Sequence, residues 1–471
     1  MREGRARTGV ENLDDNLEGG IPRGNMVLIA GNAGTGKTLL CGEFLHRGAE
    51  EGERGLYVSL AEGRASFLDY MRKIGRDLEF PALPGSVDVM DLVTIKEQGI
   101  ETLMEEILDR IDELGAERLV VDSFSALAGA FTQTIDARVA LHILGKLVKR
   151  SGCTTLLVTE VPTGGSSLGL GVEEFLADGI IQLRRGSIGG GVVRSLEVTK
   201  MRGTEIRAPR QLFTLNGGFR ALEPFRERQT GSGPPFTPTP DTPDRFSAGH
   251  PQLDQILGGF RRGDTVLIRL GEGIPPLVAA LILAPLRANS TAAGRGVMMI
   301  PPGGTGSERV TRFDERLGVT PGRRDALVRI GVFTPEPEAP YVLHLDPDDP
   351  KMTHRIWCEE KMRLAASTGG PLLKIVYLDG FDYLWPRDQA RRVLDAESAQ
   401  TKDEGSLLLL LSHPGSEELE MHASNMCNAQ VEVRSEQGVF LLRGLHPRTQ
   451  LHAIEMDPDA GYPRLTLTPM Q

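Results

Sequence analysis

An internal repeat constrains the fold of this 471-residue chain more than any other feature of its sequence. The pattern Gly-x-x-x-Leu-Asp, followed by a Gly-Gly pair, a single Gly and a Val-Leu-Ile triplet, spans residues 9–29 and returns in altered form over residues 249–268. A solenoid repeats over much shorter distances, whereas this period has the length of a whole domain. The sequence therefore predicts two copies of one fold in tandem.

Apolar strand-like runs alternate with amphipathic stretches in the first half of the chain. The stretches space their apolar residues three and four apart, which is helical periodicity. We expect strands at Asn25–Ala30, Gly55–Leu60, Arg118–Asp122 and Thr154–Thr159, and helices at Thr38–Ala49, Ser66–Ile74, Ile100–Leu114 and Thr134–Lys149. Gly179–Arg184 and Arg194–Lys200, joined by a glycine-rich tip, predict an antiparallel hairpin. This order predicts an α/β fold, with a mostly parallel sheet flanked by helices.

A change of composition divides the chain. Residues 223–244 are mainly Pro, Thr, Gly and Ser with almost no aliphatic residues, and such a segment cannot form a core. We therefore expect a first domain at 1–222, an extended linker at 223–244 and a second domain at 245–471.

The sequence between the first predicted strand and the first predicted helix is that of a phosphate-binding loop. Its glycines let consecutive backbone N–H groups turn inward around a phosphate, and the helix N-terminus adds a partial positive charge. Lys37 is expected to reach the β and γ phosphates of ATP, and the Thr38 hydroxyl to be a ligand of Mg²⁺. The loop consists of Gly31, Asn32, Ala33, Gly34, Thr35, Gly36, Lys37 and Thr38.

Three further segments carry candidate chemistry. Arg118–Asp122 is an apolar strand that ends in an acid, so Asp122 is expected beside the metal ion. Glu62 follows the second strand, where an acid either activates water or merely begins a loop. Lys200 and Arg202 alternate on one strand face, either as cationic fingers on the γ-phosphate of a neighbouring subunit or as a solvated basic strand edge.

Taken together, these motifs resemble those of the KaiC proteins within the RecA-like ATPases. The resemblance spans nearly all of the first domain and, more faintly, the second. It rests on Thr8–Asp14, Gly19–Gly24, the phosphate loop, Val121–Ser123, Gly171–Phe175 and Leu196–Thr204. It implies tandem RecA-like domains in a homo-oligomer, often a hexameric ring, with ATP at each subunit boundary. By this resemblance Lys200 and Arg202 become fingers that act in trans.

The resemblance also has departures that bear on activity. KaiC-like active domains usually carry two adjacent glutamates after the second strand, whereas this chain has Ala61 before Glu62. Only Glu62 carries over, so we expect slow hydrolysis, or ATP binding without turnover. The Ser/Thr-rich segment that the circadian protein phosphorylates is not recognisable in the second domain. The matching region of the first domain, Gly164–Phe175, resembles the non-phosphorylated domain, so no autokinase activity is expected despite Ser166 and Ser167.

The second domain has lost the residues of the phosphate site. When the repeats are aligned, Gly36, Lys37 and Thr38 fall on Pro275, Pro276 and Leu277, and proline has no N–H to offer a phosphate. The strand Ile375–Asp379 keeps the form of one that ends in a metal-binding acid. A kept fold with a dismantled site predicts a pseudo-ATPase.

Charge and composition argue against several classes of protein. A net charge of −11 and an isoelectric point near 5.5 disfavour broad binding to nucleic acid. Four scattered cysteines disfavour a zinc site or a disulfide framework. The longest apolar runs are too short to cross a bilayer, and the N-terminal arginines precede no secretory signal, so we expect a cytoplasmic protein without membrane contact.

The favoured hypothesis is an ATP-driven switch whose second domain serves assembly, regulation or the binding of an unidentified protein partner. One alternative is a non-hydrolysing ATP sensor, in which Ala61 marks lost chemistry. Another is a recombinase-like ATPase associated with single-stranded DNA. The loop that such a recombinase uses corresponds to Gly164–Phe175, which has no Lys or Arg and two glutamates, and this disfavours the idea.

Overall fold

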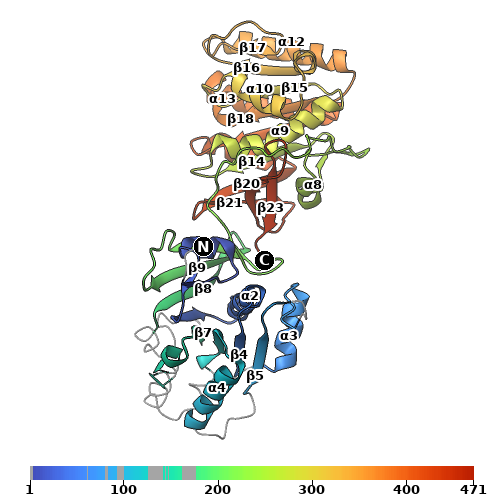
Figure 1. Cartoon of the computed structure of the whole chain (residues 1–471). Helices are drawn as coiled ribbons and strands as arrows, with labels where there is room; N and C mark the ends of the chain where they lie inside the picture. The colour runs from blue at the N-terminus through green and yellow to red at the C-terminus, as the bar shows by residue number, and fades with distance from the viewer. Residues whose placement is uncertain are drawn as a thin grey trace. The chain divides into compact units, whose positions relative to one another are not determined.

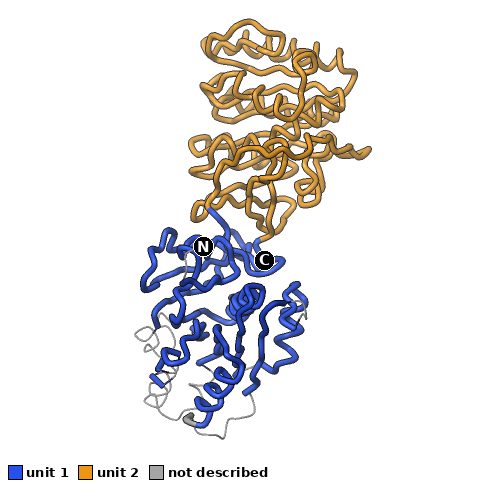
Figure 2. The backbone as a smooth tube through the Cα atoms, in the orientation of Figure 1, with its two compact units in different colours: residues 1–223, 470–471 blue, residues 224–469 orange. Residues whose placement is uncertain are grey.

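The computed structural model describes residues 4–60, 62–79, 83–92, 100–125, 142–143, 145–146, 148–161 and 177–471. The chain forms two compact units, which Figure 2 distinguishes by colour. The first unit comprises residues 1–223 together with 470–471, and the second comprises residues 224–469. Each unit is an α/β structure built on one large sheet (Figure 1).

The first unit contains a sheet of nine described strands in the order β11-β10-β9-β8-β3-β7-β6-β4-β5. The strands from β8 to β5 in this order run parallel, and β9, β10 and β11 pair antiparallel at one side. The strands are β3 (Met26–Gly31), β4 (Gly55–Ser59), β5 (Val87–Asp91), β6 (Arg118–Asp122), β7 (Thr154–Glu160), β8 (Gly179–Ile188), β9 (Gly191–Met201), β10 (Arg210–Thr214) and β11 (Arg220–Ala221). Helices described over their whole length are α1 (Glu11–Asn16), α2 (Lys37–Glu50), α3 (Arg64–Lys73) and α4 (Ile100–Leu114), and residues 148–151 are helical as well. A separate ribbon pairs β1 (Arg5–Ala6) with β2 (Ile21–Pro22).

The second unit contains a sheet of ten strands in the order β17-β16-β15-β18-β19-β14-β20-β21-β22-β23. Its strands are β14 (Thr265–Leu270), β15 (Val297–Ile300), β16 (Val328–Val332), β17 (Val342–His344), β18 (Leu373–Tyr377), β19 (Leu407–Ser412), β20 (Ala429–Glu436), β21 (Val439–His446), β22 (His452–Met456) and β23 (Leu465–Pro469). Its helices are α8 (Pro251–Leu257), α9 (Pro276–Ala292), α10 (Ser307–Arg316), α11 (Pro321–Leu327), α12 (Pro350–Thr368), α13 (Leu378–Leu384), α14 (Arg387–Glu404) and α15 (Glu417–Met426), and β12 (Arg245–Phe246) pairs with β13 (Phe260–Arg261).

Both faces of each sheet are buried, which explains why the central strands are continuously apolar. Successive residues of β3 point to opposite faces. Val27 and Ile29 pack in the core that contains α2 and α3, whereas Leu28 and Ala30 pack in the core that contains α4. In the second unit, α9 and α10 cover one face of the sheet, and α12, α13, α14 and α15 cover the other. The predicted α/β fold with helices on both faces is confirmed.

The two units have the same strand order, apart from the additional β17. β3 corresponds to β14, β7 to β19, β6 to β18 and β4 to β15. A shared turn repeats as well: the Thr8 amide donates to Asp14 at 2.7 Å, and the Ala248 amide donates to Asp254 at 2.7 Å. The prediction of two copies of one fold in tandem is therefore confirmed.

The four predicted strands and the first three predicted helices of the first half agree with the observed elements within about two residues. The predicted hairpin is formed by β8 and β9, whose strands extend three to four residues further toward the tip than predicted. The helix expected at Thr134–Lys149 falls largely outside the described residues. The segment that composition marks as a linker has no helix or strand over residues 224–244 but packs within the second unit. There Phe236 meets Tyr462 edge to face, and Asp241 forms an ion pair with Arg295.

No helix among the described residues combines the length and the apolar character that crossing a bilayer requires.

The buried Asp14 predicts a pH dependence of stability. Its Oδ2 accepts no hydrogen bond from a described residue, and burial raises the pKa of Asp14 to about 6, although hydrogen bonds from Thr8 oppose this. The folded state therefore keeps a proton that the unfolded chain loses near pH 4, so this contribution to stability is full below pH 4 and is lost as pH rises through 6. Between pH 4 and pH 7 we expect Asp14 to lower the free energy of unfolding of the natural chain by up to about 3 kcal/mol. In Asp14→Asn this decrease should be absent.

Urea unfolding at both pH values measures this effect, with Asp15→Asn on the same helix as the control for removing one exposed charge. Both tryptophans, Trp357 and Trp385, lie in the second unit, so a transition seen by circular dichroism but not by tryptophan fluorescence reports the first unit. An Asp14→Asn variant with the same pH dependence as the natural chain would contradict the assignment.

Candidate nucleotide site

The loop between β3 and α2 has the backbone of a phosphate cradle. Gly36, immediately before α2, has φ of +99°, a left-handed conformation that other residues rarely adopt. A Cβ on Gly31 would lie 2.7 Å from the carbonyl oxygen of Leu183 and 2.7 Å from the Thr35 hydroxyl. The loop therefore needs glycine at both positions, the first for close packing and the second for the turn into the helix.

Lys37 begins α2 and folds back over the loop. Its Nζ donates to the carbonyl oxygens of Gly31 at 2.9 Å and Asn32 at 3.0 Å, and the residue is only 8% exposed. Burial lowers the pKa of Lys37, and the carboxylates of Glu160 and Asp122 oppose that shift. The ammonium group is thus held at the mouth of the loop by carbonyl dipoles and two nearby negative charges.

Thr38 and Asp122 meet beside Lys37. The Thr38 hydroxyl donates to Oδ2 of Asp122 at 2.8 Å, and the Tyr57 hydroxyl donates to the same oxygen at 2.8 Å. Burial, and then the charge of Asp122, raise the pKa of Tyr57, so its hydroxyl remains a donor. Hydroxyl and carboxylate oxygens are the ligands that suit Mg²⁺. The donor set of Thr38 and Asp122 therefore fits the metal ion expected from the sequence.

Two residues of this cluster were not predicted. Tyr57 lies on β4, whose last residue, Ser59, pairs in register with Asp122. Glu160 ends β7 and pairs in register with Gly31, and it is the charge that most opposes the lowered pKa of Lys37. The signal for Glu160 was present, because Thr154–Glu160 is an apolar run that ends in an acid, as Arg118–Asp122 is.

Glu62 lies at the same edge of the sheet. It follows β4, its backbone amide donates to the Ser59 hydroxyl at 3.2 Å, and its side chain is exposed. The charge of Glu62 contributes to the raised pKa values of Tyr57 and Tyr70. Glu62 is therefore near the Asp122 cluster and accessible to solvent. Ala61 lies outside the described residues, as does the loop Gly164–Phe175 with its two serines.

Lys200 and Arg202 lie toward the amino ends of the parallel strands, whereas the phosphate loop lies at their carboxyl ends. Lys200 aligns through β8 with Leu28, about 10 Å before Gly31 along the strand direction and about 10 Å across the sheet. Its Nζ donates to the carbonyl oxygen of Ala177 at 2.7 Å, ahead of β8. Arg202 is 60% exposed and forms an ion pair with Asp178 at 3.0 Å. Neither cation is placed at the phosphate loop of its own chain.

The second unit keeps the strand and helix but not the loop. α9 begins at Pro276 as α2 begins at Lys37, and the residue before α9, Pro275, has φ of −67° where Gly36 has +99°. The structure therefore places Pro275, Pro276 and Leu277 at the positions of Gly36, Lys37 and Thr38, as the alignment of the repeats predicts. The expectation that Asp379 keeps the acid of this strand is wrong: β18 ends at Tyr377, which occupies the register position of Asp122, while Asp379 lies in α13.

Comparison with known proteins supports this structural reading. The model of the KaiC ATPase family matches residues 6–218. A UPF0273 protein of Aeropyrum pernix is 34% identical over 225 residues, which are 45% of this chain and 90% of that protein. The circadian clock protein KaiC2 of Synechocystis is 28% identical over 285 residues, which are 58% of this chain and 49% of that protein.

A solved structure, that of a KaiC-like protein from Pyrococcus horikoshii, is 30% identical, covers 46% of this chain and 99% of its own, and has a TM-score of 0.43. The family match and the nearly complete coverage of the Aeropyrum pernix relative agree with the phosphate loop, Lys37 and the Thr38–Asp122 contact. The chain therefore belongs to the KaiC-like family of RecA-superfamily P-loop ATPases.

Proposed function

We propose that the chain is a slowly ATP-hydrolysing switch, with ATP and Mg²⁺ bound by the first unit. The observation that carries the proposal is the contact between Thr38 and Asp122 beside a buried Lys37. These three side chains come from a helix start and a strand end that the fold brings to one edge of the sheet. A structural glycine turn would require no such cluster.

Each residue has a role that follows from its chemistry. The backbone amides from Gly31 to Thr38 surround the phosphates, and Lys37 exchanges its two carbonyl partners for phosphate oxygens. Thr38 and Asp122 would hold the metal ion, which would supply positive charge against the phosphates. Tyr57 fixes the orientation of Asp122 through its hydrogen bond.

Activation of water is proposed for Glu62, because it is an exposed acid close to the Asp122 cluster. Glu160 is a second acid at the same edge, but its effect on Lys37 favours an electrostatic role. The absence of a glutamate at position 61 is the reason to expect slow turnover.

Replacing Glu62 by glutamine tests this role. We expect phosphate release to fall by about a hundredfold or more, while ATP affinity stays within about threefold, because a general base acts in the reaction rather than in binding. Glu160→Gln is the matched comparison, since it neutralises another acid at the same edge. Equal turnover of Glu62→Gln and the natural chain would remove Glu62 from the mechanism.

Steady-state phosphate release in the presence of Mg²⁺ tests the function as a whole. Release above the background of Lys37→Ala supports the proposal. Tight ATP binding without any release, also in the assembled oligomer, would instead select the non-hydrolysing sensor. Salt-dependent binding of a single-stranded oligonucleotide would favour the recombinase-like alternative.

We further propose that the second unit is a pseudo-ATPase that serves assembly or the binding of a protein partner in the cytoplasm. Pro275, Pro276 and Leu277 leave it without the cation and the hydroxyl of the first site, and Tyr377 replaces the acid. The position of Lys200 and Arg202 away from their own loop supports a homo-oligomer, such as a hexameric ring, in which they contact a neighbour's ATP. Molecular mass in solution with and without ATP and Mg²⁺ tests the assembly.

A further inference from the structure

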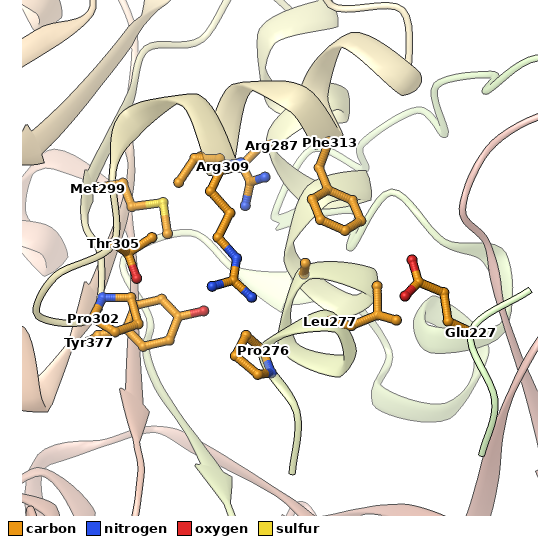
Figure 3. Close-up of a pocket in the computed structure, with 12 residues that line it drawn as sticks. Glu227, Pro276, Leu277, Arg287, Met299, Pro302, Thr305, Arg309, Phe313 and Tyr377 are labelled. Carbon is orange, nitrogen blue, oxygen red and sulfur yellow. The ribbon is translucent and has the colours of Figure 1, made fainter. Parts of the chain in front are cut away.

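The second unit contains a cavity of about 190 Å³ at the start of α9 (Figure 3). Pro276 and Leu277 line it from α9, Met299 and Tyr377 from the sheet, and Arg309 and Phe313 from α10. All of these residues belong to one unit, so the cavity is complete within it.

Four of the lining residues stand where the first unit has its polar cluster. Pro276 and Leu277 begin α9 as Lys37 and Thr38 begin α2. By strand register, Tyr377 takes the position of Asp122, and Met299 takes that of Tyr57. The cavity is therefore the counterpart of the phosphate and metal site, with its lysine, hydroxyl and carboxylate replaced by side chains that bind neither phosphate nor Mg²⁺.

A new cation enters the cavity from α10. The guanidinium group of Arg309 points into the space, toward Tyr377 and Pro276 (Figure 3). Arg309 forms no ion pair within the part of the chain that the structure describes. The other arginine of the lining, Arg287, is different, because Asp314 neutralises it at 2.7 Å. Arg309 thus offers an available charge next to a largely apolar wall.

We propose that this cavity binds a small organic monoanion with an apolar body, such as an aromatic carboxylate. The carboxylate would pair with Arg309, and the ring would lie against Leu277, Met299 and Phe313. A cavity of about 150 Å³ holds benzene, so 190 Å³ suits one ring with a short acidic substituent. Exposed Glu227 on the lining disfavours a polyanion, and a nucleoside triphosphate is too large and too highly charged.

Calorimetry with the full-length protein and phenylacetate tests the proposal, with phenylacetamide as the neutral analogue of nearly the same shape. We expect saturable binding of phenylacetate, and binding of phenylacetamide that is weaker by about tenfold or more, because a charge-assisted hydrogen bond is lost. Lys37→Ala should leave phenylacetate binding unchanged, since that residue belongs to the first unit.

Two variants locate the site. Arg309→Gln should weaken phenylacetate binding by about ten- to a hundredfold and leave phenylacetamide binding nearly unchanged. Arg316→Gln, an exposed arginine on the same helix that does not line the cavity, is the matched control and should have no effect. Ala280→Phe, which fills the cavity from α9, should abolish the binding of both compounds.

Absence of saturable phenylacetate binding below about 10 mM would overturn the proposal. So would equal affinity for the acid and the amide, or an Arg309→Gln variant that binds like the natural chain. Because Arg309 is exposed, its substitution does not depend on repacking the core, and the test stands even where Ala280→Phe fails to fold. Binding of phenylacetate with normal phosphate release keeps this site distinct from the function of the first unit.

Discussion

Replacing Lys37 by alanine is expected to lower the affinity for ATP by about a hundredfold or more. The ammonium group is already held by two carbonyl oxygens at the mouth of the loop, and it would make charge-assisted hydrogen bonds to phosphate. Each such bond contributes about 1.5–3 kcal/mol, so the loss of two exceeds a hundredfold in affinity. The amides of the loop and the Thr38–Asp122 pair remain, which leaves weak residual binding.

Calorimetric titration with ATP and Mg²⁺ measures this loss. Lys73→Ala is the matched control, because Lys73 is a lysine of the same unit that is 75% exposed. Circular dichroism of Lys37→Ala verifies that the unit still folds without the two bonds to the loop. If the natural chain takes up no nucleotide, or if Lys37→Ala takes up as much as the natural chain, the proposed site is wrong.

Removing both strand cations is expected to have the second large effect. In the double variant Lys200→Ala, Arg202→Ala, we expect turnover to fall by about a thousandfold, which is the lower end of the contribution of an arginine finger. ATP affinity should change little, because both side chains lie away from the loop of their own chain. Arg210→Ala is the matched control, since Arg210 is equally exposed at 60% and likewise forms an ion pair on the strand edge.

Mixing two inactive proteins distinguishes action in trans from a structural role. Subunits with Lys37→Ala keep the cations, and subunits with the double substitution keep the phosphate loop. Mixed oligomers should recover part of the activity, because some boundaries pair an intact loop with intact cations. Two results would contradict action in trans: full activity of the double variant, or a mixture that assembles but recovers no activity. Lys200 and Arg202 would then be a solvated basic strand edge, which is the alternative that the sequence also allows.

Residues that act through local backbone geometry were predictable from the sequence. The glycines of the loop, the position of Lys37 at a helix start and the prolines at Pro275 and Pro276 have consequences that need no distant partner. Hydrophobic periodicity likewise located β6 and α4 to the residue, because each element buries its own apolar face.

Contacts between strands could not be predicted in the same way. The hydrogen bond from Tyr57 to Asp122 depends on β4 lying next to β6 in a particular register, and Glu160 faces Gly31 only because β7 pairs with β3. The mistaken expectation for Asp379 has the same origin. Nothing in residues 373–379 indicates that the strand ends at Tyr377, because that end is set by pairing with its neighbours.

The sequence by itself determined the duplicated α/β fold, the intact phosphate loop and its loss in the second copy, since each is written in short-range spacing and residue type. Only the tertiary structure decided that Lys200 and Arg202 lie away from their own loop, and that Tyr377 and Arg309 share a cavity. The physical reason is that strand order and register bring together segments far apart in the chain. The residues of one segment do not indicate which strand pairs with it, or in which register.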